Sequence, residues 1–183
     1  SDHSKSDAAD LASRLGIELR SESIAPAVEV LEDQLGLTNT SAENLQARVR
    51  GVILMGISNQ EGHLVLTTGN KTELAVGYST IYGDSVGGFA PIKDVEKTRV
   101  WQLAKWRNAN AIGKLAEPIP VNSIEKPPSA ELRPGQVDQD SLPPYDLLDE
   151  ILQRYVEGHQ GRVALVAAGF DAATVDRVIA LVD

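Results

Sequence analysis

The sequence predicts an α/β fold, a doubly wound parallel sheet followed by a small helical segment. Three observations favour it. Short apolar runs alternate with amphipathic helical patterns, as in parallel α/β proteins. The segment His63–Glu73 reads as a strand, a turn at a glycine and a helix start. Several amphipathic helices follow a proline-rich stretch at the end. Only two strands are clear, so we expect further strands outside this chain.

Composition narrows the class of protein. The chain has 183 residues, enough for most of one domain, and we treat 1–183 as one partial domain. Its net charge of −9, without a basic stripe, argues against a nucleic-acid partner. Cysteine is absent, which excludes disulfides and thiolate chemistry in these residues. No apolar run approaches the roughly 20 residues of a membrane span, so we expect no membrane contact and a cytoplasmic location.

The first third predicts one strand and three helices. Alternating residues make Ile17–Ser21 a strand. Apolar spacing predicts helices over Ala8–Leu15, Pro26–Leu35 and Ala42–Gln60, the first two ended by glycine. Thr40 and Glu43 have capping-box spacing for the longest helix. Its predicted buried stripe is Leu45, Val49, Val52, Ile53, Gly56 and Ile57.

The middle of the chain predicts the second strand, Leu64–Thr67, and a helix entered through Asn70. A glycine-rich loop, Tyr82–Gly88, comes next. Asp94 then has the position of a cap for a helix over Val95–Asn108.

Proline dominates the next segment. Seven of the nine prolines lie between Pro118 and Pro144, which predicts an irregular loop over about 117–144. C-terminal helices follow over about 144–183. Their predicted ranges are Pro144–Val156, Arg162–Ala168 and Ala172–Val182. The first has the apolar face Leu147, Leu148, Ile151, Leu152 and Tyr155.

Glu73 is the first candidate for chemistry. Three residues after Asn70, it fits a capping box. The other interpretation is a magnesium ligand, because hard cations prefer carboxylate oxygens and bound phosphates. Thr67 and Thr68, at the end of the predicted strand, could then bond a nucleotide. The two interpretations are compatible, since a cap would fix the carboxylate in place.

Other polar residues allow both a structural and a functional interpretation. Asn44 and Arg48 share one helical flank, which is either a solvated face or a site where a guanidinium meets an anion. Lys97, at the third predicted helical position, is either an ordinary lysine or a phosphate contact. Ser129 and its neighbours Glu131 and Arg133 are either loop polarity or part of a lid.

Common catalytic signatures are missing. The three histidines are scattered, and no Walker sequence, serine elbow or dinucleotide glycine fingerprint occurs.

Several long motifs resemble the synthetase domain of glutamine-dependent NAD⁺ synthetases. They are Asn44–Gly51, Ser58–Gln60, Leu66–Glu73, Gly77–Asp84, Gly88–Val95, Pro127–Pro134 and Asp138–Asp149. The similarity covers essentially the whole chain. Other ATP-pyrophosphatase-type ligases, such as a tRNA thiolase or GMP synthetase, lack this combination of Asn-Leu-Gln-Ala-Arg and Pro-Pro-Ser-Ala-Glu.

The resemblance implies a fold and a reaction. The fold is a three-layer doubly wound parallel sheet of the adenine-nucleotide ATP-pyrophosphatase type. The family adenylates the carboxylate of nicotinic acid adenine dinucleotide (deamido-NAD) with MgATP, and ammonia displaces AMP to give NAD⁺. Ammonia comes from glutamine through a separate glutaminase domain of the full-length protein. Related synthetase domains dimerise, so the resemblance also implies a homo-oligomer.

The resemblance further assigns residues. Thr68, Lys97 and Ser129 would contact ATP, and Glu73 would bind Mg²⁺ near the reacting groups. Glu73 and Lys97 would be the catalytic pair. Deamido-NAD would be held by Asn44 and Arg48, with Glu73 nearby and with Tyr78, Ser79, Thr80 and Ile81 lining its pocket.

The chain also departs from the family pattern. It does not contain the pyrophosphate loop Ser-Gly-Gly-x-Asp-Ser, the glutaminase domain or the basic C-terminal tail. We therefore expect these residues alone to have negligible synthetase activity. The alternative hypothesis is a non-catalytic nucleotide-binding or assembly fragment.

Overall fold

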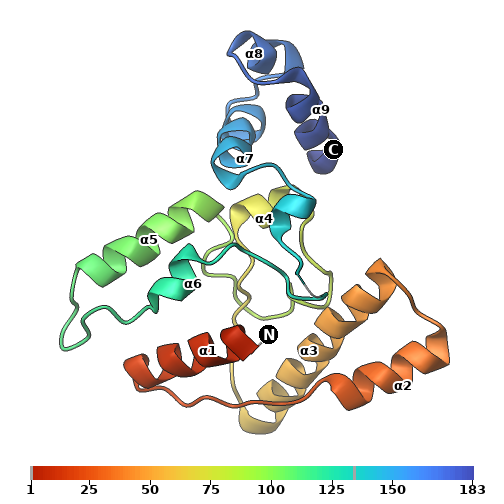
Figure 1. Ribbon diagram of the computed structural model, residues 1–183, viewed down its shortest axis with the longest axis vertical. Coiled ribbons are helices and arrows are strands. Elements are labelled where there is room, and N and C mark those ends of the chain that lie inside the picture. Colours follow the sequence, from red (N-terminus) through yellow and green to blue (C-terminus); the bar gives the residue numbers. More distant parts are fainter. Residues whose placement is uncertain (1, 134) are drawn as a thin grey trace. The chain divides into compact units, whose positions relative to one another are not determined.

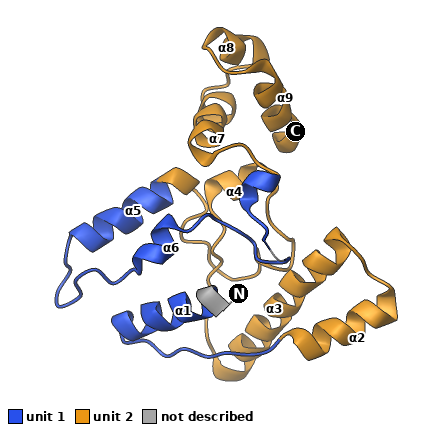
Figure 2. Cartoon of the chain, viewed as in Figure 1, with its two compact units in different colours: residues 1–23, 99–140 blue, residues 24–98, 141–183 orange. Residues whose placement is uncertain are grey.

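The computed structural model describes residues 2–133 and 135–183. The chain divides into two compact units, shown in Figure 2. Unit 1 comprises residues 1–23 and 99–140, and unit 2 comprises residues 24–98 and 141–183. The division falls within one helix, α5 (Lys97–Ala109), whose first two residues belong to unit 2. That residues 1–183 form one partial domain stays a prediction.

Unit 1 is built from helices α1 (Asp2–Leu15) and α6 (Val121–Glu125), most of α5, and the 3-10 turn η1 (Asp138–Asp140). Polar contacts join these pieces. Asn122 donates to the Asp7 carboxylate at 2.6 Å, and Lys126 pairs with Glu131 at 2.5 Å. The predicted irregular loop therefore contains two short helical turns. Of its residues, Pro134 lies outside the described part.

Unit 2 contains helices α2 (Ala25–Leu35), α3 (Thr40–Glu61) and α4 (Lys71–Ala75). After residue 141 it adds α7 (Tyr145–Leu152), the π-helical turn η2 (Gln153–Glu157), α8 (Arg162–Ala167) and α9 (Ala172–Val182). Helices α2 and α3 pack side by side, as do α8 and α9 (Figure 1).

Two apolar groups stabilise unit 2. Val28 of α2 is buried against Leu45 and Val49 of α3. In the C-terminal helices, five side chains are completely removed from solvent: Leu148, Ile151, Leu165, Val175 and Val178. The amphipathic patterns at the C-terminus therefore correctly predicted helices and their buried faces. Helix α7 is shorter than predicted, since it covers Tyr145–Leu152 and the chain continues as a π turn, and Leu147 and Tyr155 of the predicted face are half-buried.

The predicted sheet is not confirmed. Ile17–Ser21 forms no strand, so that prediction was wrong, and Ile17 keeps 58% of its surface exposed. In the predicted strand Leu64–Thr67, only Leu66 forms a bridge, parallel to Phe89. The amide of Thr67 donates to the Phe89 carbonyl at 2.9 Å. A pair of short strands is marginal without further neighbours, and nothing described here pairs with Ile17–Ser21.

Two predicted helix starts were wrong. Asn39 rather than Thr40 is the N-cap residue of α3, its φ is 54°, and it makes no side-chain cap bond. Helix α5 begins at Lys97, so Asp94 is not its cap and Lys97 is its first rather than third residue. The cause of the second difference is a tertiary contact to the first amides of α5, described below.

The predicted stripe of α3 was right in part, and Ile53 packs against the buried Leu45 and Val49. Leu45 and Val49 are buried, but Val52 is 72% exposed and Gly56 also lies open. Ala47 and Gly51 are buried instead, because a loop packs on that side of the helix. Among the described residues, no helix is long and apolar enough to cross a membrane.

Candidate functional site

The helix start at Asn70 fixes the position of the Glu73 carboxylate, the predicted magnesium ligand. Asn70 is buried, and its side-chain oxygen accepts from the Glu73 amide at 3.0 Å. In return, Glu73 Oε2 accepts from the Asn70 amide at 3.2 Å. This is the predicted capping box, and it is confirmed. Because one carboxylate oxygen is held by the backbone, the other has a defined direction.

The second carboxylate oxygen of Glu73 contacts the Lys97 ammonium. Lys97 Nζ lies 2.8 Å from Glu73 Oε1, and the two side chains are only 16% and 18% exposed. The ammonium also lies 5.3 Å from the centre of the Tyr145 ring, a cation–π distance. The structure therefore brings together the two residues predicted to be catalytic, in a partly desolvated setting where charge acts more strongly than in water.

A second cluster unites most of the predicted substrate residues. Thr80 Oγ1 donates to Asn44 Oδ1 at 3.0 Å, and Arg48 Nε donates to the Ile81 carbonyl at 3.2 Å. The Thr80 amide donates to Asp84 Oδ1 at 2.7 Å, which closes the turn. Asn44 and Arg48, one helical turn apart in α3, thus hold Thr80 and Ile81 at the end of the segment 78–81.

The two clusters are connected through the backbone. The Tyr78 amide donates to the Glu73 carbonyl at 2.8 Å, directly after α4 ends. Tyr78 and Ser79 are half-buried in the same segment. The first residue of the predicted substrate segment is therefore hydrogen-bonded to the backbone of Glu73.

Two glycines allow the loop to approach α3. A Cβ atom at Gly51 would lie 2.7 Å from the Tyr82 carbonyl oxygen. A Cβ atom at Gly83 would lie 2.8 Å from that of Ala47. Both distances are shorter than side chains tolerate, so these glycines set how closely the turn 80–86 sits on the helix.

Thr68 and Ser129 are the other two predicted ATP contacts. Thr68 is exposed beyond the Leu66 bridge. Ser129 belongs to unit 1, whereas the other predicted site residues belong to unit 2. Its hydroxyl oxygen accepts from the Glu131 amide at 3.0 Å, which stabilises the turn after the paired prolines.

Sequence reasoning missed two residues of α7, Tyr145 and Asp149. Both are buried, and Asp149 accepts bonds from Thr72 and from the Thr98 amide. A usable signal was present, because Asp149 lies among the buried apolar positions of α7 rather than on its polar side. A charged residue on an apolar face needs polar partners.

A magnesium site is only partly built by the described residues. No group of three His, Asp or Glu side chains there could hold a metal. Mg²⁺ is, however, commonly bound through one or two carboxylates together with substrate phosphates and waters. Glu73 fits that role as a single ligand, since a carboxylate offers about four lone-pair positions and its hydrogen bonds here occupy two of them.

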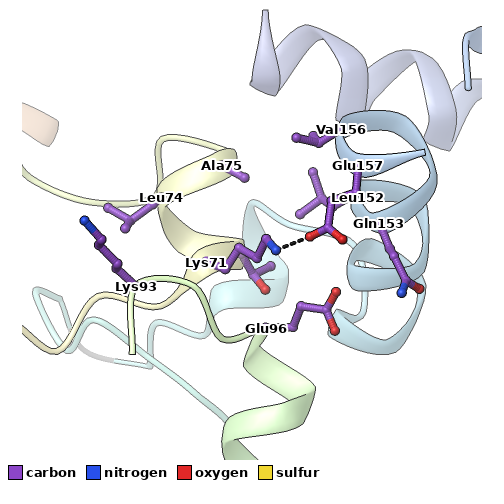
Figure 3. A pocket seen from close by; sticks show the side chains of 10 residues that line it. Lys71, Leu74, Ala75, Lys93, Glu96, Leu152, Gln153, Val156 and Glu157 are labelled. Atoms are coloured by element: carbon purple, nitrogen blue, oxygen red, sulfur yellow. Dashed lines mark hydrogen bonds and ion pairs between the residues drawn. The ribbon is translucent and has the colours of Figure 1, made fainter. Parts of the chain in front are cut away.

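A pocket of about 280 Å³ lies beside α4 (Figure 3). Its walls include Leu152 and Val156, and Lys71 reaches across it to Glu157. The hydrogen bond to Glu157, supported by Asp94, raises the pKa of Lys71 above its ordinary value. Of the ten predicted site residues, none lines this pocket, so it is separate from the candidate site.

Comparison with known proteins shows which protein family the chain belongs to. The sequence profile of the NAD synthase family matches residues 1–183. The chain belongs to the NAD synthase family.

Particular relatives narrow the comparison. The chain is 53% identical over 182 residues to the glutamine-dependent NAD(+) synthetase of Rhodobacter capsulatus, covering 94% of this chain and 33% of the relative. It is 56% identical over 174 residues to the corresponding protein of Xanthomonas campestris, covering 92% and 31%. The chain therefore spans about a third of the length of these curated relatives.

Solved structures of two synthetases also match this chain. A glutamine-dependent NAD⁺ synthetase from Acinetobacter baumannii, in complex with ADP, matches all of this chain and 32% of its own with a TM-score of 0.65 and 43% identity. An NMN synthetase from Francisella tularensis matches 99% of this chain and 68% of its own with a TM-score of 0.79 and 28% identity. These neighbours are consistent with the ATP-pyrophosphatase fold.

Proposed function

We propose that this chain is part of the ligase domain of a glutamine-dependent NAD⁺ synthetase. The reaction is ATP-dependent amidation of deamido-NAD, with ammonia normally supplied from glutamine by a glutaminase domain of the same protein. The observation that carries the proposal is the Glu73–Lys97 pair at 2.8 Å, joined through Tyr78 to the cluster around Asn44 and Arg48. High identity to enzymes of that name supports it.

The chemistry runs in two steps. A carboxylate oxygen of deamido-NAD attacks the α-phosphorus of ATP, a P–O bond breaks, and pyrophosphate leaves. Ammonia then attacks the carbonyl carbon of the adenylate, AMP leaves with the C–O electron pair, and one proton is released. Neither step needs a nucleophilic side chain, which is compatible with a chain that has no cysteine.

Lys97 addresses the main electrostatic obstacle, which is the approach of two anions. Its ammonium would hydrogen-bond phosphate oxygens and stabilise the charge of the departing pyrophosphate. Glu73 keeps that ammonium oriented before substrate binds, since their atoms are already in contact. Magnesium, when bound, would neutralise phosphate charge, and Glu73 would supply a carboxylate oxygen to it.

Arg48 and Asn44 would position the dinucleotide. Arg48 uses Nε for the Ile81 carbonyl, and its two terminal amino groups would make a bidentate contact with a phosphate or carboxylate of the substrate. Asn44 already orients Thr80 of the segment that would line the substrate pocket. Thr68 and Ser129 would contact ATP, and Tyr78, Ser79 and Ile81 would line the deamido-NAD pocket. Positioning of this kind supplies much of the rate in adenylate-forming reactions.

The proposal is tested with the intact protein that contains these residues. It should form NAD⁺ from deamido-NAD and ATP with either ammonia or glutamine as the nitrogen source. Replacement of deamido-NAD by nicotinic acid mononucleotide tests the alternative product indicated by the Francisella relative's name. Nucleotide binding without any amide formation would favour the non-catalytic hypothesis and overturn the proposal.

A further inference from the structure

Asp149 is a buried carboxylate with an unusual pair of partners. It is 5% exposed and sits on α7 between buried leucines. One oxygen accepts from the hydroxyl of Thr72, and the other accepts from the backbone amide of Thr98 at 2.9 Å. Burying a carboxylate is costly unless it is hydrogen-bonded, so both contacts are needed for it to stay in place.

Thr72 links Asp149 to the backbone amide of Lys97 through two hydrogen bonds. Its side chain is completely buried in α4, and Oγ1 accepts from the Lys97 amide at 2.9 Å while donating to Asp149. The first two amides of α5 therefore both end on Asp149, one directly and one through a hydroxyl. Such amides have no partner within their own helix, which explains why α5 starts at Lys97.

These bonds surround the candidate catalytic pair. Thr72 precedes Glu73 in α4, and the amides of Lys97 and Thr98 lie at the start of α5. Helix α7 also places the Tyr145 ring against the Lys97 ammonium at 5.3 Å. Helix α7 thus contacts the side chain of Lys97 directly and is linked to its backbone amide through Thr72.

We propose that Asp149 is a positioning residue for the ligase reaction. It sets the placement of Lys97 relative to Glu73 by fixing the start of α5 against α4. This inference rests on the proposed function, and Asp149 itself touches no reacting atom. It makes the C-terminal helical segment part of the working site, although the segment carries none of the residues assigned to substrates.

The test uses the intact enzyme and four variants. Asp149→Asn keeps the shape of the side chain but cannot accept from both donors at once. Thr72→Val removes the hydroxyl at nearly constant volume, and Thr72→Ser restores it. Asp146→Asn is the matched control, since Asp146 is an exposed acid on the same helix.

We expect Asp149→Asn and Thr72→Val to lower kcat about 100-fold, the scale of an ångström-sized misplacement, with little change in the KM for deamido-NAD. Thr72→Ser and Asp146→Asn should stay near the wild-type rate. Hydrogen exchange gives a readout separate from activity: the amides of Lys97 and Thr98 should exchange faster in Asp149→Asn than in Asp146→Asn.

A cycle with Lys97→Met separates positioning from general support of the fold. If Asp149 acts through Lys97, Asp149→Asn should add almost no loss in the Lys97→Met background. Independent, multiplicative losses, or a full rate in both Asp149→Asn and Thr72→Val, would overturn the inference. An inactive wild-type protein would instead contradict the proposed function, so the two failures are distinguishable.

Discussion

Gly51→Ala is expected to disturb the substrate cluster without touching any assigned residue. The new Cβ would lie 2.7 Å from the Tyr82 carbonyl oxygen and 3.2 Å from Val86 Cγ1. Ordinary contact begins at 3.4 Å, so the loop must retreat by 3.4 − 2.7 = 0.7 Å. Because the nearest atom is backbone, the turn 80–86 moves as a whole and draws Thr80 and Ile81 away from α3.

Two opposing contributions set the change in folding free energy caused by Gly51→Ala. Overpacking costs about 1–3 kcal/mol, and alanine gains up to about 1 kcal/mol over glycine inside a helix. Gly56→Ala is the matched control, since it lies in the same helix and its Cβ would meet nothing within 4 Å. The difference between the variants therefore isolates the contact, and about 1–3 kcal/mol corresponds to roughly 2–12 °C in Tm for a domain of this size.

The assay combines thermal unfolding with steady-state kinetics of the intact enzyme. Gly51→Ala should melt below Gly56→Ala and should raise the KM for deamido-NAD about tenfold, while the KM for ATP changes less. Gly56→Ala should match the wild type in kinetics and melt at the same temperature or slightly higher. Equal melting and an unchanged KM in Gly51→Ala would refute the close approach of loop and helix.

Three further predictions concern single residues. Glu73→Gln should lower ammonia-dependent NAD⁺ synthesis at least 100-fold with little change in Tm, because glutamine still completes the capping box but cannot pair with Lys97; near-normal turnover would refute the role of the carboxylate. Arg48→Lys should raise the KM for deamido-NAD with kcat nearly unchanged, because a point charge cannot replace a bidentate contact; an unchanged KM would count against it. Asp171 caps α9, and its pKa is lowered by the Thr174 backbone amide and then by the Thr174 hydroxyl. Since the folded pKa is depressed, Asp171→Ala should lower Tm at pH 7, and the difference should shrink as the pH falls through that pKa; a pH-independent difference would argue against the carboxylate as the cause.

Local signals were read correctly from the sequence. The capping box at Asn70 and Glu73 spans three residues, so its geometry is set by the helix start itself. The C-terminal helices were predicted for a similar reason, because their apolar spacing is strong and their ends carry Gly169 and Asp171.

Contacts over longer separations were not readable from spacing. Asn44 and Thr80 are 36 residues apart, and only the family resemblance placed them in one site. Thr72 and Asp149 are 77 residues apart, and together they bind the first amides of α5, so the cap at Asp94 was predicted wrongly and the role of Asp149 was missed. The strand at Ile17–Ser21 failed because alternation predicts a half-buried strand only where a neighbouring strand is available to pair with it.

The central claim is that Glu73 and Lys97 form the adenylation site of a NAD⁺ synthetase. Exchange of labelled pyrophosphate into ATP, measured in the intact enzyme without ammonia, tests it most directly, because only adenylate formation and its reversal produce exchange. We expect exchange that requires deamido-NAD and that is lost in both Glu73→Gln and Lys97→Met. Exchange that does not depend on deamido-NAD, or that persists at the wild-type rate in both variants, would contradict it.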